Sequence, residues 1–279
     1  SDKQSNLTYR AFFPEDRQIG SYPCTSVELG NVCYISVGMV TNAHEKIAKG
    51  AFQLRDLVSP NKDKQHPKKF VEGKNINAWY RENHTWLEWG TDRAPSQFRR
   101  QAFTELFEQP EKILAIKVGA IRAAFDDDQL FTNEGVYVTV PWHSLAGVRN
   151  NSLKKAARYA DEKPHPNLPL REELEAISRR FSIKYLLAVM NSSTARDFLR
   201  ANRRSNIQLY PDDWKKLPIP DVPPERQQPL VVLVDRILAA KYADPAADIS
   251  EMEAELDRLV SALYGLTEPE SETLKGGQS

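Results

Sequence analysis

Apolar and polar positions along the first half of the chain predict several strands. Val32–Gly38, Lys112–Val118 and Gly135–Val140 are rich in β-branched and aromatic residues, which strands favour. Thr85–Trp89 alternates apolar with polar positions, as a half-buried strand does. Ala51–Val58 fits either a strand or a short helix. These segments therefore predict a strand-rich first half.

Apolar residues at spacings of three and four predict helices that lie mostly in the last third of the chain. A serine at 192 or 193 is suited to cap one of them, and Ser250 with Glu253 has the spacing of a capping box. Gly265 fits a helix end in the left-handed conformation. The predicted helices are Phe98–Glu108, Leu170–Val189, Ser192–Asn202, Pro229–Lys241 and Ser250–Tyr264.

Proline-rich segments separate these elements. Leu217-Pro-Ile-Pro220 cannot lie within a helix, because each proline fixes φ and pushes the residue before it into an extended shape. We call this extended run, from Trp214 to Asp221, the strap. The segment 149–171 holds three prolines and many cations and is expected to be a long exposed insertion, and Lys68–Gly73 is expected to lead into a loop.

The order of these elements predicts an α+β fold, because strands and helices show no repeating βαβ alternation. We expect a lead-in segment over 1–30, a mixed core over 31–220 and a helical segment over 221–279 that packs on the core. The spacing of the strap and the last helices predicts a common set of buried residues. That set is Leu217, Ile219, Val232, Val234, Leu256, Leu259 and Leu263.

Composition places the chain among globular proteins. It has 279 residues, of which 41% are hydrophobic, enough for one large domain or two small ones. No apolar run reaches the ~18 residues that a membrane helix needs, so no membrane partner and a cytoplasmic location are expected. Cys24 and Cys33 match no metal-ligand spacing and are expected to be free thiols, at least one of them buried.

Charge is balanced overall and unevenly distributed. Of 38 acidic and 38 basic residues, 12 acidic and 5 basic residues lie between Asp221 and Ser279, which leaves the rest of the chain with a balance of +7. A basic body with an acidic end suits a body that contacts a polyanion.

Motifs for catalysis are absent from the sequence. There is no Gly-x-Gly turn, no phosphate-binding loop and no Asn-Pro-Pro-Tyr type of loop for a target base. Asp63 followed by Glu72-Gly-Lys74 superficially matches the metal site of many restriction nucleases, but loop residues surround these positions. We therefore predict no catalytic residue and no metal ligand, and keep a small metal-dependent nuclease as a minor alternative.

Six segments, taken in order, resemble the C-terminal specificity region of large adenine methyltransferases of restriction-modification systems, in particular the TaqI and Eco57I classes. The specificity subunits of type I systems are similar more loosely. Phe70, Asn75 and Met190 depart from the residues that are commonest in that family. The matching segments are Gly38-Met-Val-Thr, Lys69–Ile76, Lys112–Lys117 with Ala124–Asp126, Tyr185–Ser192, Leu217–Pro220 and Leu263–Thr267.

The resemblance implies a non-catalytic target-recognition domain that grips duplex DNA opposite a methyltransferase domain, on the same chain or another. S-adenosylmethionine would then bind that methyltransferase domain, and no cofactor is expected in this chain. The alternative is a protein-interaction or structural module. DNA readers need cations for phosphates and arginine or amide side chains for base edges. The predicted phosphate contacts are Lys69, Lys74, Arg99, Arg100, Lys154 and Lys155, and the predicted base contacts are Arg149, Asn150, Asn151, Arg203, Arg204 and Asn206.

Overall fold

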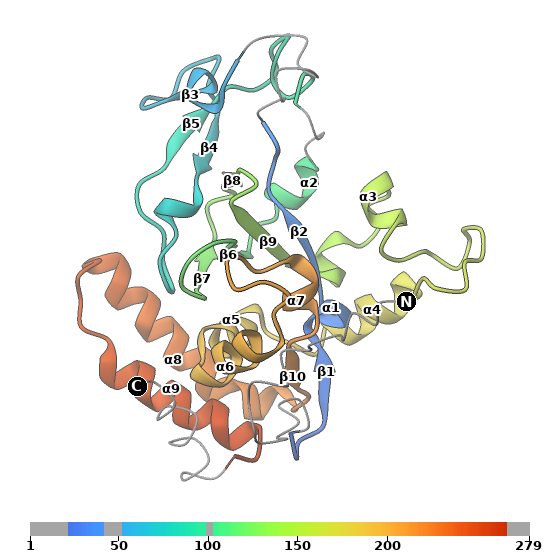
Figure 1. The fold of residues 1–279 in the computed structure, drawn as a ribbon, viewed down its shortest axis with the longest axis vertical. Coiled ribbons are helices and arrows are strands. Elements are labelled where there is room, and N and C mark those ends of the chain that lie inside the picture. The colour runs from blue at the N-terminus through green and yellow to red at the C-terminus, as the bar shows by residue number, and fades with distance from the viewer. Residues whose placement is uncertain (1–21, 42–51, 99–102, 267–279) are drawn as a thin grey trace, which may run out of the picture.

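The computed structural model describes residues 22–41, 52–98 and 103–266 and has the predicted α+β class (Figure 1). Its centre is a four-stranded antiparallel sheet in the order β2-β9-β6-β7. The three strands predicted from β-branched runs are confirmed within it. The strands of this central sheet are β2 (Cys33–Val37), β6 (Lys112–Ile116), β7 (Ala123–Asp126) and β9 (Val136–Pro141).

Both faces of the central sheet are buried, which explains its near-continuous apolar sequences. Along β6, Ile113 and Ala115 join the cluster formed with the C-terminal helices. Leu114 and Ile116 point the other way and join a second cluster of buried residues. The helices after residue 221 therefore share a core with the central sheet.

A second four-stranded sheet, in the order β3-β5-β4-β8, lies at the top of Figure 1. The expected half-buried strand at 85–89 is confirmed, and the ambiguous segment at 51–58 is a 3-10 turn followed by a short strand. Lys68–Val71 is a strand rather than the approach to a loop, because it pairs with β5 on one side and β8 on the other. The elements are η2 (Leu54–Leu57), β3 (Val58–Ser59), β4 (Lys68–Val71), η3 (Gly73–Asn75), β5 (Thr85–Leu87) and β8 (Phe131–Thr132).

The single helix predicted over 170–189 is wrong, because the chain forms two helices there, α4 (Arg171–Ser178) and α5 (Ile183–Asn191). The buried side chain of Gln227 fills the break. Its amide accepts a hydrogen bond from the Ser182 N–H at 3.0 Å and donates one to the Arg180 carbonyl at 2.7 Å. A partner from a distant helix thus satisfies backbone groups that a continuous helix would have paired internally.

The two C-terminal helices are α8 (Pro224–Ala243) and α9 (Ser250–Leu263). The predicted start at Pro229 is wrong. Pro224 occupies the first helical position, where no amide hydrogen is needed, and Pro229 sits on the exposed side of the second turn. The predicted capping box is also wrong, because Ile249 is the N-cap and the Glu253 carboxylate accepts a hydrogen bond from the Trp79 indole at 2.7 Å.

Most of the expected buried set lies in the core. Leu217, Ile219, Val234 and Leu256 are buried, while Leu259 and Leu263 are half-buried. Val232 is 48% exposed, so the prediction fails there. The reason is the helical period: its neighbours Leu233 and Val234 face the core, which turns Val232 toward solvent.

The strap forms β10 (Pro218–Pro220), which pairs antiparallel with β1 (Ser26–Glu28). Because Pro218 and Pro220 lack amide hydrogens, their carbonyls are the groups that need partners. Tyr264 donates to the Pro218 carbonyl at 2.5 Å and Tyr185 donates to the Pro220 carbonyl at 2.9 Å. The extended shape predicted for the strap is confirmed for Pro218–Pro220 and is wrong at Trp214 and Lys215, which lie in the helix α7 (Pro211–Lys215). Residues 26–28 of the expected lead-in belong to the strap's sheet.

Helix α9 ends at a left-handed glycine, as predicted. Gly265 has φ of +73°, and its amide donates to the Ala262 carbonyl at 3.1 Å. The Leu266 amide donates to the Ser261 carbonyl at 3.0 Å, which completes a Schellman motif. Tyr264 is fully buried beside it.

The remaining described helices are short except one. The predicted helix 192–202 is confirmed, and the Ser192 hydroxyl caps it by accepting from the Ala195 amide at 3.1 Å. The predicted helix 98–108 is seen as one turn, with 99–102 outside the described residues. The insertion 149–171 is largely exposed but is anchored by buried Leu153 and Ala157. These elements are α1 (Leu29–Val32), α2 (Thr104–Phe107), η4 (Trp142–Leu145), α3 (Asn151–Lys154), α6 (Ser193–Asn202) and α7 (Pro211–Lys215). Cys33 is buried and Cys24 half-buried, both as free thiols.

Candidate nucleic-acid interface

Two loops that are far apart in sequence meet at one end of the central sheet. One is the β6–β7 connection, residues 117–122, and the other precedes α7, residues 203–208. Val118 and Gln208 form an antiparallel bridge, and the Leu209 amide donates to the Lys117 carbonyl at 3.0 Å. We call residues 117–122 and 203–208 the two-loop surface.

Buried polar contacts fix the base of both loops. The side-chain amide of Asn191, at the end of α5, pairs with the Ala123 backbone, accepting from its amide and donating to its carbonyl, each at 2.9 Å. The Tyr137 hydroxyl donates to the Leu209 carbonyl at 2.5 Å. Gly119, with φ of +102°, makes the turn of the first loop. The loops are therefore held on a rigid support.

The two-loop surface carries four cations and no acidic residue of its own. Lys117, Arg122 and Arg203 have no carboxylate within salt-bridge distance in the part of the chain that the structure describes. The Nε atoms of Arg122 and Arg203 are buried and have no hydrogen-bond partner. Arg204 is paired with Asp212 at 3.0 Å and with Asp213 at 3.4 Å. The local field is thus positive, as an anion-binding surface requires.

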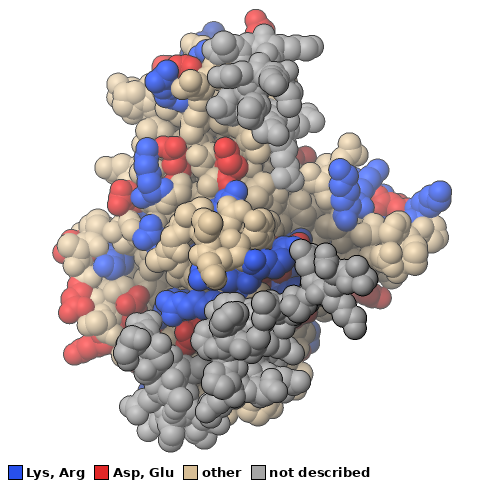
Figure 2. All heavy atoms as spheres, in the orientation of Figure 1, with Lys and Arg blue, Asp and Glu red and all other residues tan. Residues whose placement is uncertain are grey.

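Two large apolar side chains project from the same surface. Ile207 is 79% exposed and Val118 is 57% exposed. Figure 2 shows Lys and Arg side chains in a band across the middle of the viewed face, where Figure 1 draws α7 and the loop before it. Exposed apolar groups among unpaired cations suit contact with a polyanion that also offers apolar edges.

The insertion supplies a second cationic group, seen over α3 in Figure 2. Asn151, Lys154 and Lys155 are exposed there, and neither lysine has an ion-pair partner among the described residues. Asn150 is the N-cap of α3 and accepts from two backbone amides, at 2.9 and 3.0 Å. Arg149 pairs with Asp161 at 2.8 Å, so it needs to exchange that partner before it can contact DNA.

Two other predicted phosphate contacts, Lys69 and Lys74, lie near the second sheet and are already paired. Lys69 on β4 contacts Asp128 at 2.6 Å, and Asp128 also binds Arg81. Lys74 contacts Glu72 at 2.6 Å with most of its side chain exposed. Arg99 and Arg100 lie outside the described residues. All twelve predicted contacts remain predictions, and the structure divides the described ones among three places.

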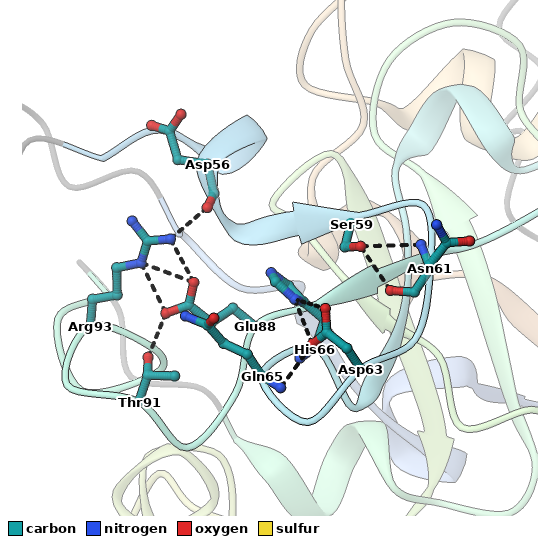
Figure 3. Close-up of polar contacts among 9 residues, drawn as sticks. All are labelled: Asp56, Ser59, Asn61, Asp63, Gln65, His66, Glu88, Thr91 and Arg93. Atoms are coloured by element: carbon teal, nitrogen blue, oxygen red, sulfur yellow. Dashed lines mark hydrogen bonds and ion pairs between the residues drawn. The ribbon is translucent and has the colours of Figure 1, made fainter.

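The second sheet also carries a polar cluster, drawn in Figure 3. Glu88 is fully buried and its carboxylate accepts hydrogen bonds from Arg93 and Thr91, which hold the pKa of Glu88 below its ordinary value. Asp63 binds the His66 ring at 2.9 Å, and this hydrogen bond lowers the pKa of Asp63. Each carboxylate thus has a local structural partner.

In the nuclease alternative, Asp63 makes no hydrogen bond or ion pair with Glu72 or Lys74 in the described part of the chain. Asp63 bonds the backbone of 65 and 66 and the His66 ring, while Glu72 caps η3 and pairs with Lys74. No group of three His, Cys, Asp or Glu side chains that could hold a metal ion occurs among the described residues. Nor does any described helix have the length and apolar character to cross a membrane.

Sequence reasoning missed half of the two-loop surface. The predicted contacts do not include Lys117, Val118, Arg122, Ile207 or Gln208. A usable signal was present: a glycine turn between two strands with a cation on either side, and a stretch free of acids from 203 to 208. Only the fold shows that these stretches are neighbours.

No family model matches the chain, and no curated protein matches its sequence. Among solved structures it is similar to a chain of a type I restriction-modification system, with 16% identity and a TM-score of 0.42 over 92% of this chain and 48% of that one. A HsdS subunit from Thermoanaerobacter tengcongensis has 17% identity and a TM-score of 0.40, over 90% and 45% of the two chains. The type IIL restriction-modification enzyme MmeI, solved in complex with DNA, has 11% identity and a TM-score of 0.40, over 94% and 37%. This chain spans less than half of each, and TM-scores below 0.5 do not establish a shared fold.

Proposed function

We propose that this chain is a non-catalytic, sequence-specific DNA-recognition domain of a restriction-modification or phage-defence DNA methyltransferase. It would position duplex DNA for adenine methylation by a separate catalytic domain, on the same chain or another. S-adenosylmethionine would bind that catalytic domain. The observation that carries the proposal is the two-loop surface, where Lys117, Arg122 and Arg203 are held on a rigid base without acidic partners.

The motifs that resemble the specificity regions support the proposal, because several have identifiable roles in this fold. A Cβ atom at Gly38 would lie 2.1 Å from the Asn133 carbonyl oxygen, so only glycine fits there. Asn191 holds the β6–β7 loop, and the strap carbonyls receive two tyrosine hydroxyls. Of these motif residues, Asn191 supports the surface that would contact DNA, and the others hold the scaffold on which that surface is built.

The test is a titration of a fluorescent 20-base-pair duplex with the 279-residue chain at several salt concentrations. Phosphate contacts release counterions, so affinity should fall linearly with salt on logarithmic axes. Lys117→Ala, Arg122→Ala and Arg203→Ala should each lower that slope by about one if the residue contacts a phosphate. Binding without salt dependence, or no binding at 50 mM salt, would contradict the proposal.

Arg236→Ala is the matched control, because Arg236 is an exposed cation on α8 with no ion-pair partner among the described residues. It should leave the slope unchanged. An equal effect at Arg236 and Arg203 would mean that binding follows total charge and that the two-loop surface is not special. The alternative, a protein-interaction module, predicts that none of these variants changes DNA affinity.

The proposal also predicts that the chain by itself neither binds S-adenosylmethionine nor methylates DNA, because the sequence has no cofactor turn or target-base loop. Isothermal titration calorimetry measures this directly. Tight, stoichiometric binding of the cofactor would contradict the division of labour between this chain and a catalytic domain.

A further inference from the structure

The two-loop surface places an apolar side chain and an amide side by side. Val118 and Gln208 are directly opposite each other in the antiparallel bridge that joins the loops. Side chains that are opposite in such a pair point to the same face, with Cβ atoms about 5 Å apart. One half-exposed amide and one mostly exposed aliphatic group are therefore presented together to solvent.

The two positions before Gln208 in the second loop repeat this combination of an amide and an aliphatic side chain. Asn206 is exposed and has no hydrogen-bond partner in the described part of the chain, and Ile207 beside it is 79% exposed. Leaving two β-branched aliphatic groups in water is unfavourable by itself, because the transfer of apolar surface out of water is favourable. Their exposure is explained if a ligand with apolar groups covers them.

One DNA base pair offers the complement of this combination. In the major groove a T·A pair presents the methyl group and O4 acceptor of thymine together with the N6 donor and N7 acceptor of adenine. Aliphatic side chains contact the methyl group, and an Asn or Gln amide can bind N6 and N7 together. A G·C pair has no methyl group and favours arginine or lysine on guanine instead.

The charges around these four side chains favour the same partner. Lys117 lies next to Val118 in the chain, and Arg203 and Arg204 begin the second loop, while no carboxylate belongs to either loop. Cations at the margin can bind phosphates and fix the position of the loops in a groove, leaving the central residues to contact bases.

We propose that the two-loop surface reads A·T pairs in the major groove, with Val118 and Ile207 on thymine methyl groups and Gln208 and Asn206 on adenine edges. This inference rests on the proposed function, since it specifies which bases the same surface recognises.

The experiment begins with selection of a binding site from a randomised 20-base-pair duplex pool by the 279-residue chain. The selected duplex is then synthesised with deoxyuridine in place of individual thymidines, which removes the methyl group and leaves the hydrogen-bonding edge unchanged. Each contacted methyl group is worth about 0.8 kcal/mol, so its removal should weaken binding about fourfold.

The decisive measurement repeats this comparison with the variant Val118→Ala/Ile207→Ala. The affinity of this variant for the thymidine duplex should be lower than that of the wild type. Its affinities for the thymidine and deoxyuridine duplexes should differ by less than twofold, because the side chains that contact the methyl groups are gone. Val232→Ala is the control, since Val232 is an exposed aliphatic residue on α8, and it should keep the fourfold preference.

The outcomes separate this inference from the proposed function. Three results would overturn the inference and leave DNA recognition intact. The first is salt-dependent binding that deoxyuridine does not weaken, and the second is an equal deoxyuridine effect in wild type and the double variant. The third is selection of sites that contain no A·T pairs. Failure of the chain to bind any duplex would overturn both, and would favour an acidic protein as the partner of these cations.

Discussion

The strap region and the two-loop surface use polar and apolar side chains in opposite ways. In the strap region, Tyr264 and Tyr185 are buried and donate their hydroxyls to the carbonyls of Pro218 and Pro220. In the two-loop surface, Lys117, Arg122 and Arg203 have no acidic partners among the described residues, and Ile207 is largely in water. An unsatisfied polar group is costly in an interior but available for a ligand at a surface.

This contrast explains which residues a family resemblance can detect. Strap residues such as Pro218 meet fixed partners within the fold, so the range of side chains that fits is narrow. Loop residues such as Ile207 meet few neighbours, and many side chains are compatible with the same backbone. We expect changes in the first region to alter stability and changes in the second to alter binding alone.

The largest expected effect comes from the interior of the central sheet, where Lys112 and Asp126 form a fully buried ion pair at 2.5 Å. Lys112→Met should destabilise the chain by about 3–5 kcal/mol, because it leaves a buried carboxylate without its cation. Urea unfolding measures this change. The double variant Lys112→Met/Asp126→Asn should recover part of the loss, because it removes the unpaired charge.

If the double variant is no more stable than Lys112→Met, then the lost contacts of the ammonium group, including its hydrogen bond to the Phe107 carbonyl at 2.7 Å, outweigh the charge. The contrast with the two-loop surface would then rest on hydrogen bonding rather than on charge pairing.

The next effect concerns the helix that packs beside the strap. Leu256→Ala should cost about 2–5 kcal/mol, because Leu256 is 1% exposed and its removal leaves a cavity. Leu259→Ala, one turn further on and half-buried, should cost clearly less. Urea unfolding of the two variants makes a matched pair, and equal losses would mean that burial does not govern stability along α9.

Much of this fold follows from sequence patterns because the decisive interactions are local. Runs of β-branched residues predict the strands at 33–37, 112–116 and 136–141, and Gly265 ends α9 as its position predicts. The misses involve distant partners. Gln227 hydrogen-bonds backbone groups at the break in the helix expected over 170–189. The carboxylate of Glu253 accepts from the Trp79 indole and does not form the expected capping box.

The candidate site was predictable only in part for the same reason. Arg203, Arg204 and Asn206 stand out as a polar run in sequence, but nothing local links them to Lys117 or Val118. Their proximity depends on Asn191, which holds the β6–β7 loop in place from a helix about 70 residues away. A pairing of that kind has no periodic signature in the sequence.

A smaller effect should distinguish the second sheet by its response to pH. The pKa of Glu88 is lowered from its ordinary value of 4.5, chiefly by the hydrogen bond from Arg93. Its contribution to stability is therefore present above pH 4.5 and is lost as pH falls through the folded-state pKa. Glu88→Gln should cost about 1.5–3 kcal/mol at pH 7 and should flatten the acid limb of the stability curve.

Glu105→Gln is the control for this measurement, since Glu105 is exposed and no side-chain partner of it occurs among the described residues. It should leave both the stability at pH 7 and the acid limb unchanged. Acid limbs of equal slope in wild type and Glu88→Gln would show that the Glu88–Arg93 contact does not persist in solution.

The smallest effect on stability is expected at the two-loop surface itself. Arg203→Ala should change the free energy of unfolding by less than about 0.5 kcal/mol, because no ion pair or hydrogen bond of its side chain is lost. The same variant should weaken DNA binding. Equal losses on the selected and a scrambled duplex would assign Arg203 to a phosphate, whereas a loss of about 1–3 kcal/mol on the selected duplex alone would assign it to a base. A stability loss as large as that of Leu256→Ala would remove the distinction between the two regions, because Arg203 would then belong to the scaffold.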